Sequence, residues 1–152
     1  MNVINFYSTK DNKYGVFSNF SRHTIKLDDK IWPTSEHYFQ AMKFENNEVI
    51  IEQIRTATTP AEAARLGRDR SVPIRNDWES VKDYAMRTAV WAKITQYPEL
   101  KELLLSTGND MLVEHTKNDS YWGDGGDGTG INMLGIILME VRNKLRSNRE
   151  YF

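Results

Sequence analysis

Residues 33–44 of this chain are Pro33-Thr34-Ser35-Glu36-His37-Tyr38-Phe39-Gln40-Ala41-Met42-Lys43-Phe44. A residue that precedes proline is biased toward an extended backbone, and threonine and serine are preferred helix N-caps. We therefore expect a helix that begins near Thr34 or Ser35 and ends near Phe44 or Glu45. The rest of the predicted fold is built outward from this helix.

The expected helix carries three polar side chains on one face. Glu36, Gln40 and Lys43 lie at positions i, i+4 and i+7, which share a face. About 10 Å of helix rise separates Glu36 from Lys43, which is too far for a tight ion pair between straight side chains. The three groups can converge on a ligand that lies across the face. The alternative is a solvated stripe with Tyr38 and Met42 packed beneath it, because charged residues are mostly exposed.

Short strands are expected before this helix, and further helices after it. A β-prone run covers residues 3–7, and residues 24–27 and 30–32 flank Asp28-Asp29, which predicts a hairpin. Helices are expected over residues 48–56, 59–67, 77–95, 98–104 and 131–146, with a short strand at 110–114. The elements predict an α+β fold, a mostly α-helical single domain over residues 1–152 with a small antiparallel sheet.

Three of the later helices carry specific signals. Thr59-Pro60-Ala61-Glu62 is a capping box with proline at the first helical position. Asp77 is the expected cap of the long helix, whose mostly apolar stripe is Val81, Tyr84, Ala85, Thr88, Ala89 and Ala92. The expected buried face of the last helix is Leu134, Ile137, Leu138, Val141 and Leu145. Arg142, Lys144 and Arg146 near the end of that helix suit the helix dipole.

Composition excludes several classes of protein. The chain has 152 residues and no cysteine, so disulfide frameworks and thiolate zinc sites are excluded. The net charge is −1, from 20 basic and 21 acidic residues, which does not indicate a broad electrostatic surface for nucleic acid. The chain begins without the pattern of a signal peptide and has no apolar run of the ~18 residues that a membrane span needs. We therefore expect a cytoplasmic protein that does not bind membranes.

A second candidate site is the loop over residues 118–130, which is rich in aspartate, glycine and aromatic residues. Gly123, Gly125 and Gly128 match G-x-G-x-x-G, but no apolar strand leads into them and too little chain follows for a dinucleotide fold. The aspartates do not follow the calcium-loop pattern. A ligand-binding loop and a flexible surface loop both remain open. The amides at the start of the last helix, near residues 130–132, are a weak candidate for phosphate binding.

The histidines and Trp78 give weaker signals. His23, His37 and His115 are scattered without the spacing of a metal site, so we expect no metal and no cofactor. Trp78 begins the long helix, where packing in the core is the usual role of a tryptophan. Stacking on the ring of a ligand is the alternative.

Several of these segments occur in the order seen in one family, and together they cover nearly the whole chain. The segments are Gly15-Val16-Phe17-Ser18-Asn19-Phe20, residues 32–44, Leu66-Gly67-Arg68, Asp77-Trp78, Thr107-Gly108, Asp119-Ser120-Tyr121-Trp122-Gly123 and residues 132–142. On this ordered set the chain resembles the NADAR family.

The resemblance implies an N-glycosidase. Family members are associated with removing ribose phosphates from intermediates of riboflavin synthesis, and with removing ADP-ribose from modified guanine. The expected partner is thus a small-molecule or nucleic-acid-linked substrate that carries ADP-ribose or ribose phosphate. Residues 124–129 depart from the family in being unusually acidic and glycine-rich, which affects the preference for the leaving group more than the reaction.

The resemblance also directs the choice of site residues. Cleavage of an N-glycosidic bond builds positive charge on the ribose and needs an acid for the leaving nitrogen, for which Glu36 and Asp119 are the best carboxylates. Lys43 is the expected nucleophile, through a Schiff base with the opened sugar. The expected substrate-binding residues are Asn19, Arg22, Gln40, Arg68, Trp78, Trp122, Gly123 and Asn132. Arg68 has a second interpretation, since it sits at a helix end and can simply satisfy carbonyl groups there.

Two other classes of function remain as alternatives. A non-catalytic module that binds ADP-ribose or a nucleotide would keep the tryptophans and the basic contacts, but it could dispense with Glu36 or Lys43. Both residues are present, which favours the enzyme. A plain interaction protein would be expected to carry an exposed apolar or strongly charged face, and the sequence shows neither.

Overall fold

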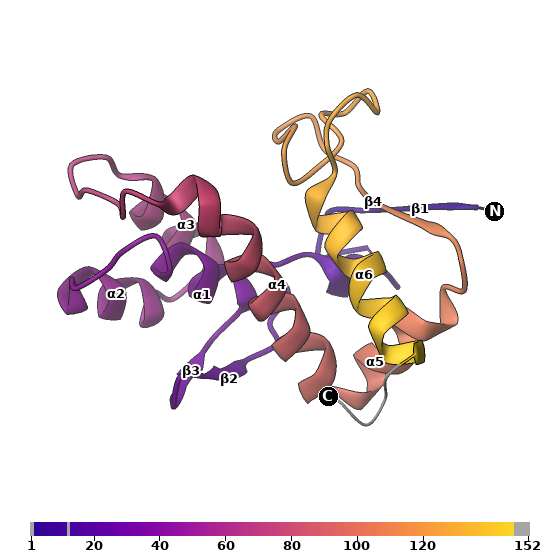
Figure 1. Ribbon diagram of the computed structural model, residues 1–152, viewed down its shortest axis with the longest axis horizontal. Helices are drawn as coiled ribbons and strands as arrows, with labels where there is room; N and C mark the ends of the chain where they lie inside the picture. Colours follow the sequence, from indigo (N-terminus) through magenta and orange to yellow (C-terminus); the bar gives the residue numbers. More distant parts are fainter. Residues whose placement is uncertain (1, 12, 148–152) are drawn as a thin grey trace. The chain divides into compact units, whose positions relative to one another are not determined.

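The computed structural model describes residues 2–11 and 13–147 (Figure 1). The chain forms two compact units. One is continuous and covers residues 19–93, and the other combines residues 1–18 with residues 94–152. The expectation of a single domain over residues 1–152 stays a prediction.

The continuous unit begins with the hairpin that the sequence predicts. Strands β2 (Ile25–Leu27) and β3 (Lys30–Trp32) pair antiparallel, with Ile25 opposite Trp32. Asp28 and Asp29 form the turn with φ of 57° and 62°. Two successive residues in the left-handed region are typical of the two-residue turn that matches strand twist.

Helices α1 (Ser35–Ala41), α2 (Glu48–Arg55) and α3 (Pro60–Arg68) follow, and α4 (Trp78–Gln96) begins in this unit. Figure 1 shows α1, α2 and α3 lying together, and the structure packs each of the three against the other two. The expected cap of α3 is confirmed, since Thr59 Oγ1 accepts the amide of Glu62 at 3.0 Å, whereas the carboxylate of Glu62 binds Arg65 and not the amide of Thr59. The core of the unit consists of Ile25, Trp32, Tyr38, Ala41, Phe44, Ile50, Ile54, Ala63, Ala89 and Ala92.

Helix α4 differs from its prediction in two respects. Tyr84 is 73% exposed, whereas Met86 and Val90, which lie outside the predicted stripe, are buried. Asp77 directly precedes the helix, as expected of its cap, and its carbonyl accepts the amides of Ser80 at 3.0 Å and Val81 at 3.2 Å. Its carboxylate binds the side chain of Arg75, with Nε of Arg75 2.5 Å from Oδ1.

The discontinuous unit contains strands β1 (Val3–Phe6) and β4 (Met111–Glu114), the short 3-10 helix η1 (Gly15–Phe17), and helices α5 (Pro98–Ser106) and α6 (Met133–Ser147). Strands β1 and β4 pair in parallel, with Val3 opposite Met111. Parallel strands need a long connection, and here more than one hundred residues separate the partners. Local sequence patterns do not predict such a pair.

Helix α6 buries its predicted face, with Leu134, Ile137, Leu138, Val141 and Leu145 all shielded from solvent. Gly135 lies against the carbonyl oxygen of Leu112, so a side chain at this position would collide with β4. The prediction that Arg142 serves the helix dipole was wrong. Arg142 is buried, and its Nη1 donates to Thr107 Oγ1 at 2.8 Å and to the carbonyl of Asp110 at 2.9 Å.

The α+β, mostly helical fold class is confirmed, but the strands form two separate pairs, one antiparallel and one parallel. In the part of the chain that the structure describes, every helix is too short or too polar to span a membrane.

Candidate functional site

Helix α1 is held at its start by a buried hydrogen-bond chain. Thr34 is the N-cap, and its Oγ1 accepts the amide of His37 at 3.2 Å and lies 2.8 Å from His37 Nδ1. His37 Nε2 lies 3.0 Å from the carbonyl of Ala57, and burial lowers the pKa of His37. His37 therefore ties α1 to the turn after α2.

Asn19 fixes the same end of the helix. Its Oδ1 accepts Ser35 Oγ at 2.8 Å, its backbone carbonyl accepts the amide of Glu36 at 3.2 Å, and its Nδ2 donates to Met86 Sδ at 3.2 Å. The predicted ligand-binding residue Asn19 thus uses its polar groups to position Ser35 and Glu36.

The solvated-stripe alternative for α1 was wrong. Glu36 and Lys43 are each 7% exposed and Gln40 is 2% exposed. The Nε2 atom of Gln40 donates to Glu36 Oε2 at 2.7 Å. Burial of charged and polar groups costs free energy, so three such groups buried together indicate a functional site and not a contribution to helix stability.

Helix α1 ends at Ala41, before the expected end near Phe44 or Glu45, so Lys43 lies just beyond the helix. Its amide donates to the carbonyl of Gln40 at 3.3 Å, and its own carbonyl accepts the amide of Arg75 at 2.8 Å. The backbone is thus fixed on both sides of the side chain. The Nζ atom lies 3.4 Å from the carbonyl oxygen of Gly67 in α3 and 6.0 Å from the centre of the Phe39 ring.

The surroundings of Lys43 favour a neutral amine. Burial is the largest cause that lowers the pKa of Lys43, to about 8, and the positive charges of Arg70 and Arg68 lower it further. The Glu36 carboxylate acts in the opposite direction and raises the pKa. An amine with such a pKa has an appreciable neutral fraction near pH 7–8, which is the form that attacks a carbon.

Arg68 and Arg70 are exposed at the end of α3, and neither guanidinium forms a hydrogen bond or ion pair within residues 2–11 and 13–147. Arg65, one turn earlier, differs because it is paired with Glu62. Arg22 is exposed and donates to the carbonyl of Thr58 at 3.2 Å. Arg68 and Arg70 are therefore free to bind an anion beside Lys43.

Trp78 is buried at the start of α4 and packs against Phe39, with ring centroids 5.2 Å apart at an interplanar angle of 57°. Phe39 in turn faces the ammonium group of Lys43. Trp78 therefore supports the aromatic ring next to the amine. Packing in the core, the usual role of a tryptophan, accounts for the position of Trp78.

The remaining predicted site residues belong to the discontinuous unit. Asp119 Oδ1 accepts the amides of Tyr121 at 2.9 Å and Trp122 at 2.8 Å. Trp122 is half-buried and packs edge-on against Tyr121, with ring centroids 4.8 Å apart. Asp119 thus shapes the turn that presents Trp122.

Gly123 and Asn132 connect this loop to β4 and α6. Gly123 is buried, and a Cβ atom there would lie 2.8 Å from the carbonyl oxygen of Glu114. Asn132 has a φ of 59°, and its side chain accepts the amide of Glu114 and donates to the carbonyl of Leu112, both at 2.9 Å. The polar groups of the Asn132 side chain are thus used within the fold.

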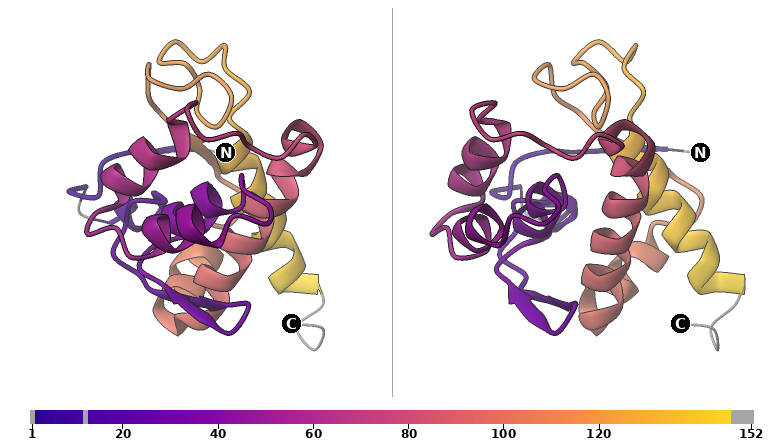
Figure 2. Two further views of the ribbon diagram at one scale, coloured as in Figure 1. Left: turned by 90° about the vertical axis from the view of Figure 1, so that its left-hand side faces the viewer. Right: turned by 60° about the vertical axis from the view of Figure 1, so that its left-hand side comes forward.

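The loop folds over the start of α6 (Figure 2). Carbonyl oxygens of residues 120–123 accept the amides of residues 131–134, at 2.8 to 3.1 Å. The prediction that these amides bind phosphate was wrong, because the loop already occupies them. Asp124 is buried, and its carboxylate accepts the amides of Thr116 and Gly126 and pairs with His115 at 2.7 Å. These bonds to His115, Gly126 and Thr116 hold the pKa of Asp124 below its usual value.

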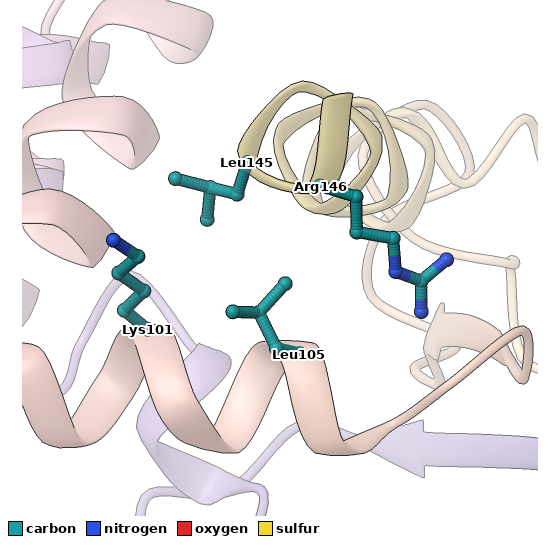
Figure 3. Close-up of a pocket in the computed structure, with 4 residues that line it drawn as sticks. All are labelled: Lys101, Leu105, Leu145 and Arg146. Carbon is teal, nitrogen blue, oxygen red and sulfur yellow. The ribbon is translucent and has the colours of Figure 1, made fainter. Parts of the chain in front are cut away.

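The discontinuous unit contains a cavity of about 330 Å³. It is lined by Lys101 and Leu105 of α5 and by Leu145 and Arg146 of α6 (Figure 3). None of the predicted site residues lines it. Within the described ranges, no three histidine or carboxylate side chains gather in a way that would hold a metal ion.

The comparison with known families covers nearly the whole chain. The model of the NADAR domain matches residues 5–146. This chain belongs to the NADAR family. The resemblance drawn from the ordered motifs is thereby confirmed.

Relatives within the family are similar over nearly their full length. The chain is 59% identical to "N-glycosidase YbiA" of Escherichia coli (strain K12) over 143 residues, which are 94% of this chain and 88% of the relative. It is 46% identical to "N-glycosidase Npun_R5314" of Nostoc punctiforme, over 88% of this chain and 87% of the relative. The solution structure of the E. coli protein YbiA matches with a TM-score of 0.89 at 56% identity, over 97% of this chain and 87% of that one.

A plant relative matches nearly all of this chain, but over only part of its own length. The "Riboflavin biosynthesis protein PYRR, chloroplastic" of Zea mays is 43% identical over 95% of this chain, which corresponds to 25% of the plant protein. The similarity to N-glycosidases confirms the expectation of an enzyme of the N-glycosidase class.

The sequence analysis of this NADAR chain missed three residues next to Lys43. Gly67 provides the carbonyl, Phe39 the ring and Arg70 a positive charge. The spacing Arg68-x-Arg70 directly after a helix was visible in the sequence. The roles of Gly67 and Phe39 depend on the packing of α1 against α3, which no local pattern indicates.

Proposed function

We propose that this chain is an N-glycosidase that hydrolyses the bond between a phosphorylated ribose and the nitrogen of its base or amine, in intermediates of riboflavin synthesis. The observation that carries the proposal is the buried amine of Lys43, whose pKa is lowered to about 8 beside the carboxylate of Glu36. The name of the maize relative, a riboflavin biosynthesis protein, supports the riboflavin branch. A cytoplasmic location stays a prediction from the sequence.

The residues support a covalent route. Lys43 passes a proton to the Glu36 carboxylate and attacks C1′ of the ribose as the neutral amine. The electron pair of the C1′–N bond passes to the leaving nitrogen, which takes this proton from Glu36. Glu36 takes a proton from the attached amine and passes it to the ring oxygen as the C1′–O4′ bond breaks, which gives a Schiff base. Water then adds to C1′ and releases the sugar phosphate, which restores the amine. One water is consumed for each bond cleaved.

The unpaired guanidinium groups next to this amine suit an anionic sugar. Arg68 and Arg70 would hold the phosphate, since guanidinium groups bind phosphate oxygens in bidentate geometry. Asp119 stays the second candidate for proton transfer, and Trp122 stays the candidate for stacking on the base. The carboxylate of Asp119 already orders its own loop.

The test is release of the free base or amine, followed by mass spectrometry. Purified protein is incubated separately with the phosphoribosylated pyrimidine intermediate of riboflavin synthesis and with DNA that carries ADP-ribosylated guanine. We expect release from the first substrate. Release from the ADP-ribosylated DNA alone would replace the riboflavin branch by the other activity that the family resemblance implies.

The covalent route has a separate test. Borohydride added during turnover should trap an adduct on the protein, and Lys43→Ala should abolish it. Lys26→Ala is the matched control, because Lys26 is an exposed lysine of the same unit. An adduct that survives Lys43→Ala would place the nucleophile elsewhere. Tight binding of ADP-ribose without cleavage of either substrate would instead favour the non-catalytic binding module.

A further inference from the structure

Gly67 occupies a helical position at which glycine is not required by the backbone. It lies within α3, and its φ is outside the left-handed region that favours glycine. Glycine inside a helix is unfavourable relative to alanine, since it loses more conformational freedom on folding. A reason other than helix formation is therefore needed for this residue.

The reason is the space that Gln40 occupies. A Cβ atom at Gly67 would overlap with Oε1 of Gln40 and would lie 2.8 Å from its Cδ atom. Gln40 is 2% exposed, so its side chain is enclosed where it meets α3. The absence of a side chain at Gly67 is what allows Gln40 to lie against α3.

In this position Gln40 holds the carboxylate of Glu36. Its Nε2 donates to Glu36 Oε2 at 2.7 Å, whereas its Oε1 has no hydrogen-bond partner in the described part of the chain. The opposite orientation of the amide would bring Oε1 against a carboxylate oxygen, so the contact with Glu36 sets the orientation. A buried amide oxygen without a hydrogen-bond partner costs free energy. The Gln40 side chain thus keeps the hydrogen bond to Glu36 while its own Oε1 atom goes without one.

Gly67 also contacts the other reactive group, because its carbonyl oxygen lies 3.4 Å from Lys43 Nζ. We infer that Gly67 is a positioning residue that sets both groups of the active site, Lys43 through its carbonyl and Glu36 through Gln40. The inference rests on the proposed roles of Glu36 and Lys43. One residue of α3 thus sets how the acid and the nucleophile lie relative to each other.

The experiment is a double-mutant cycle of Gly67→Ala and Gln40→Ala, measured on the substrate that the wild type cleaves. Gly67→Ala should lower kcat by about 100-fold with little change in KM, because displacement of a catalytic group by about 1 Å costs roughly this much. In the Gln40→Ala background, Gly67→Ala should cause no further loss, since the space is already empty. The titration of Lys43 in the pH profile should stay in place, because the carbonyl contact is kept.

A merely structural role of Gly67 predicts a different result. The losses of the two substitutions would then add, and the melting temperature of Gly67→Ala would fall together with its activity. Additive losses, or a kcat for Gly67→Ala within about threefold of the wild type, would overturn the inference.

A readout without substrate separates this inference from the proposed function. The side-chain amide protons of Gln40 should exchange slowly with solvent in the wild type and fast in Gly67→Ala and Glu36→Ala, as followed by NMR. Slow exchange that is lost in both variants would support the placement of Gln40 even if no ribosylated substrate is cleaved. Exchange that is unchanged by Gly67→Ala would contradict the placement whatever the substrate.

Discussion

The Nζ atom of Lys43 lies 3.4 Å from the carbonyl oxygen of Gly67, so the amine is held between α3 and the ring of Phe39. The carbonyl accepts a hydrogen bond without adding a full negative charge. Burial therefore remains the largest influence on this amine, and the pKa of Lys43 falls from the usual value of a lysine to about 8. This relationship gives two predictions that depend on pH.

The first concerns the rate. Attack on C1′ needs the neutral amine and the leaving nitrogen needs a proton from Glu36, so kcat/KM should follow a bell-shaped pH profile that falls as the pair loses its last proton near pH 8. The measurement is a pH–rate profile between pH 5.5 and 10 on the substrate that the protein cleaves. A rate that is flat through this range would contradict the amine as nucleophile.

The second concerns stability. The pKa of Lys43 is lower in the folded protein than in the unfolded chain, so the unfolded chain binds more protons between about pH 8 and the usual lysine pKa of 10.5. Burial of the charged amine thus costs stability below pH 8, and this cost disappears as the pH rises to 10.5. Lys43→Met should therefore stabilise the protein at pH 7 by about 1–3 kcal/mol while abolishing activity.

Urea unfolding at several pH values checks this prediction. The gain of Lys43→Met over the wild type should be largest below pH 8 and should shrink toward pH 10. Lys26→Met, at an exposed position, should show no such trend. A variant Lys43→Met that is less stable than the wild type at pH 7 would mean that the contacts of the amine outweigh the cost of its burial.

The arginines after α3 give a third prediction. Arg70 lowers the pKa of Lys43 and is free to bind phosphate. Arg70→Ala should therefore move the alkaline fall in the pH–rate profile to higher pH and increase KM for a phosphorylated substrate. Arg65→Ala is the matched control, since Arg65 is paired with Glu62 and should change neither quantity. Equal effects of the two substitutions would show that general positive charge, and not the position of Arg70, is responsible.

A fourth prediction separates binding from folding at Asn132. Its side chain makes two hydrogen bonds to β4 at a backbone φ of 59°. Asn132→Ala removes both bonds and leaves a residue that tolerates this φ poorly, so the free energy of unfolding should fall by about 2–3 kcal/mol. Asn143→Ala, at an exposed position of α6, should change it by less than about 0.5 kcal/mol. Lost activity at unchanged stability would instead support the predicted contact with substrate.

The sequence predicts the elements that depend on local signals. The N-cap at Thr59, the hairpin around Asp28-Asp29 and the buried face of α6 are all found where the patterns place them. Each depends on residues a few positions apart. The parallel pairing of β1 with β4 has no local signal, because its partners are far apart in the chain.

Local sequence patterns do not predict that the candidate site is buried. Polar residues are mostly exposed, so a pattern of Glu36, Gln40 and Lys43 favours a solvated face on general grounds. The structure buries all three because α3 packs against α1 and Gly67 leaves room for Gln40. Similarly, Lys93 is buried in α4, although charged residues are mostly exposed, and the predicted stripe of that helix does not include it.

The last prediction concerns Asp119, whose Oδ1 already accepts the amides of Tyr121 and Trp122. A turn that needs an acceptor at Oδ1 is satisfied by asparagine as well as by aspartate, whereas proton transfer needs the carboxylate. If Asp119 takes part in the reaction, Asp119→Asn should lower kcat by about 100-fold or more while the melting temperature stays within about 2 °C. Asp119→Ala should lower both, because it also removes the acceptor and leaves two amides unpaired. Activity that survives Asp119→Asn and is lost in Asp119→Ala would assign Asp119 to the shape of the loop, and would leave Glu36 as the carboxylate of the reaction.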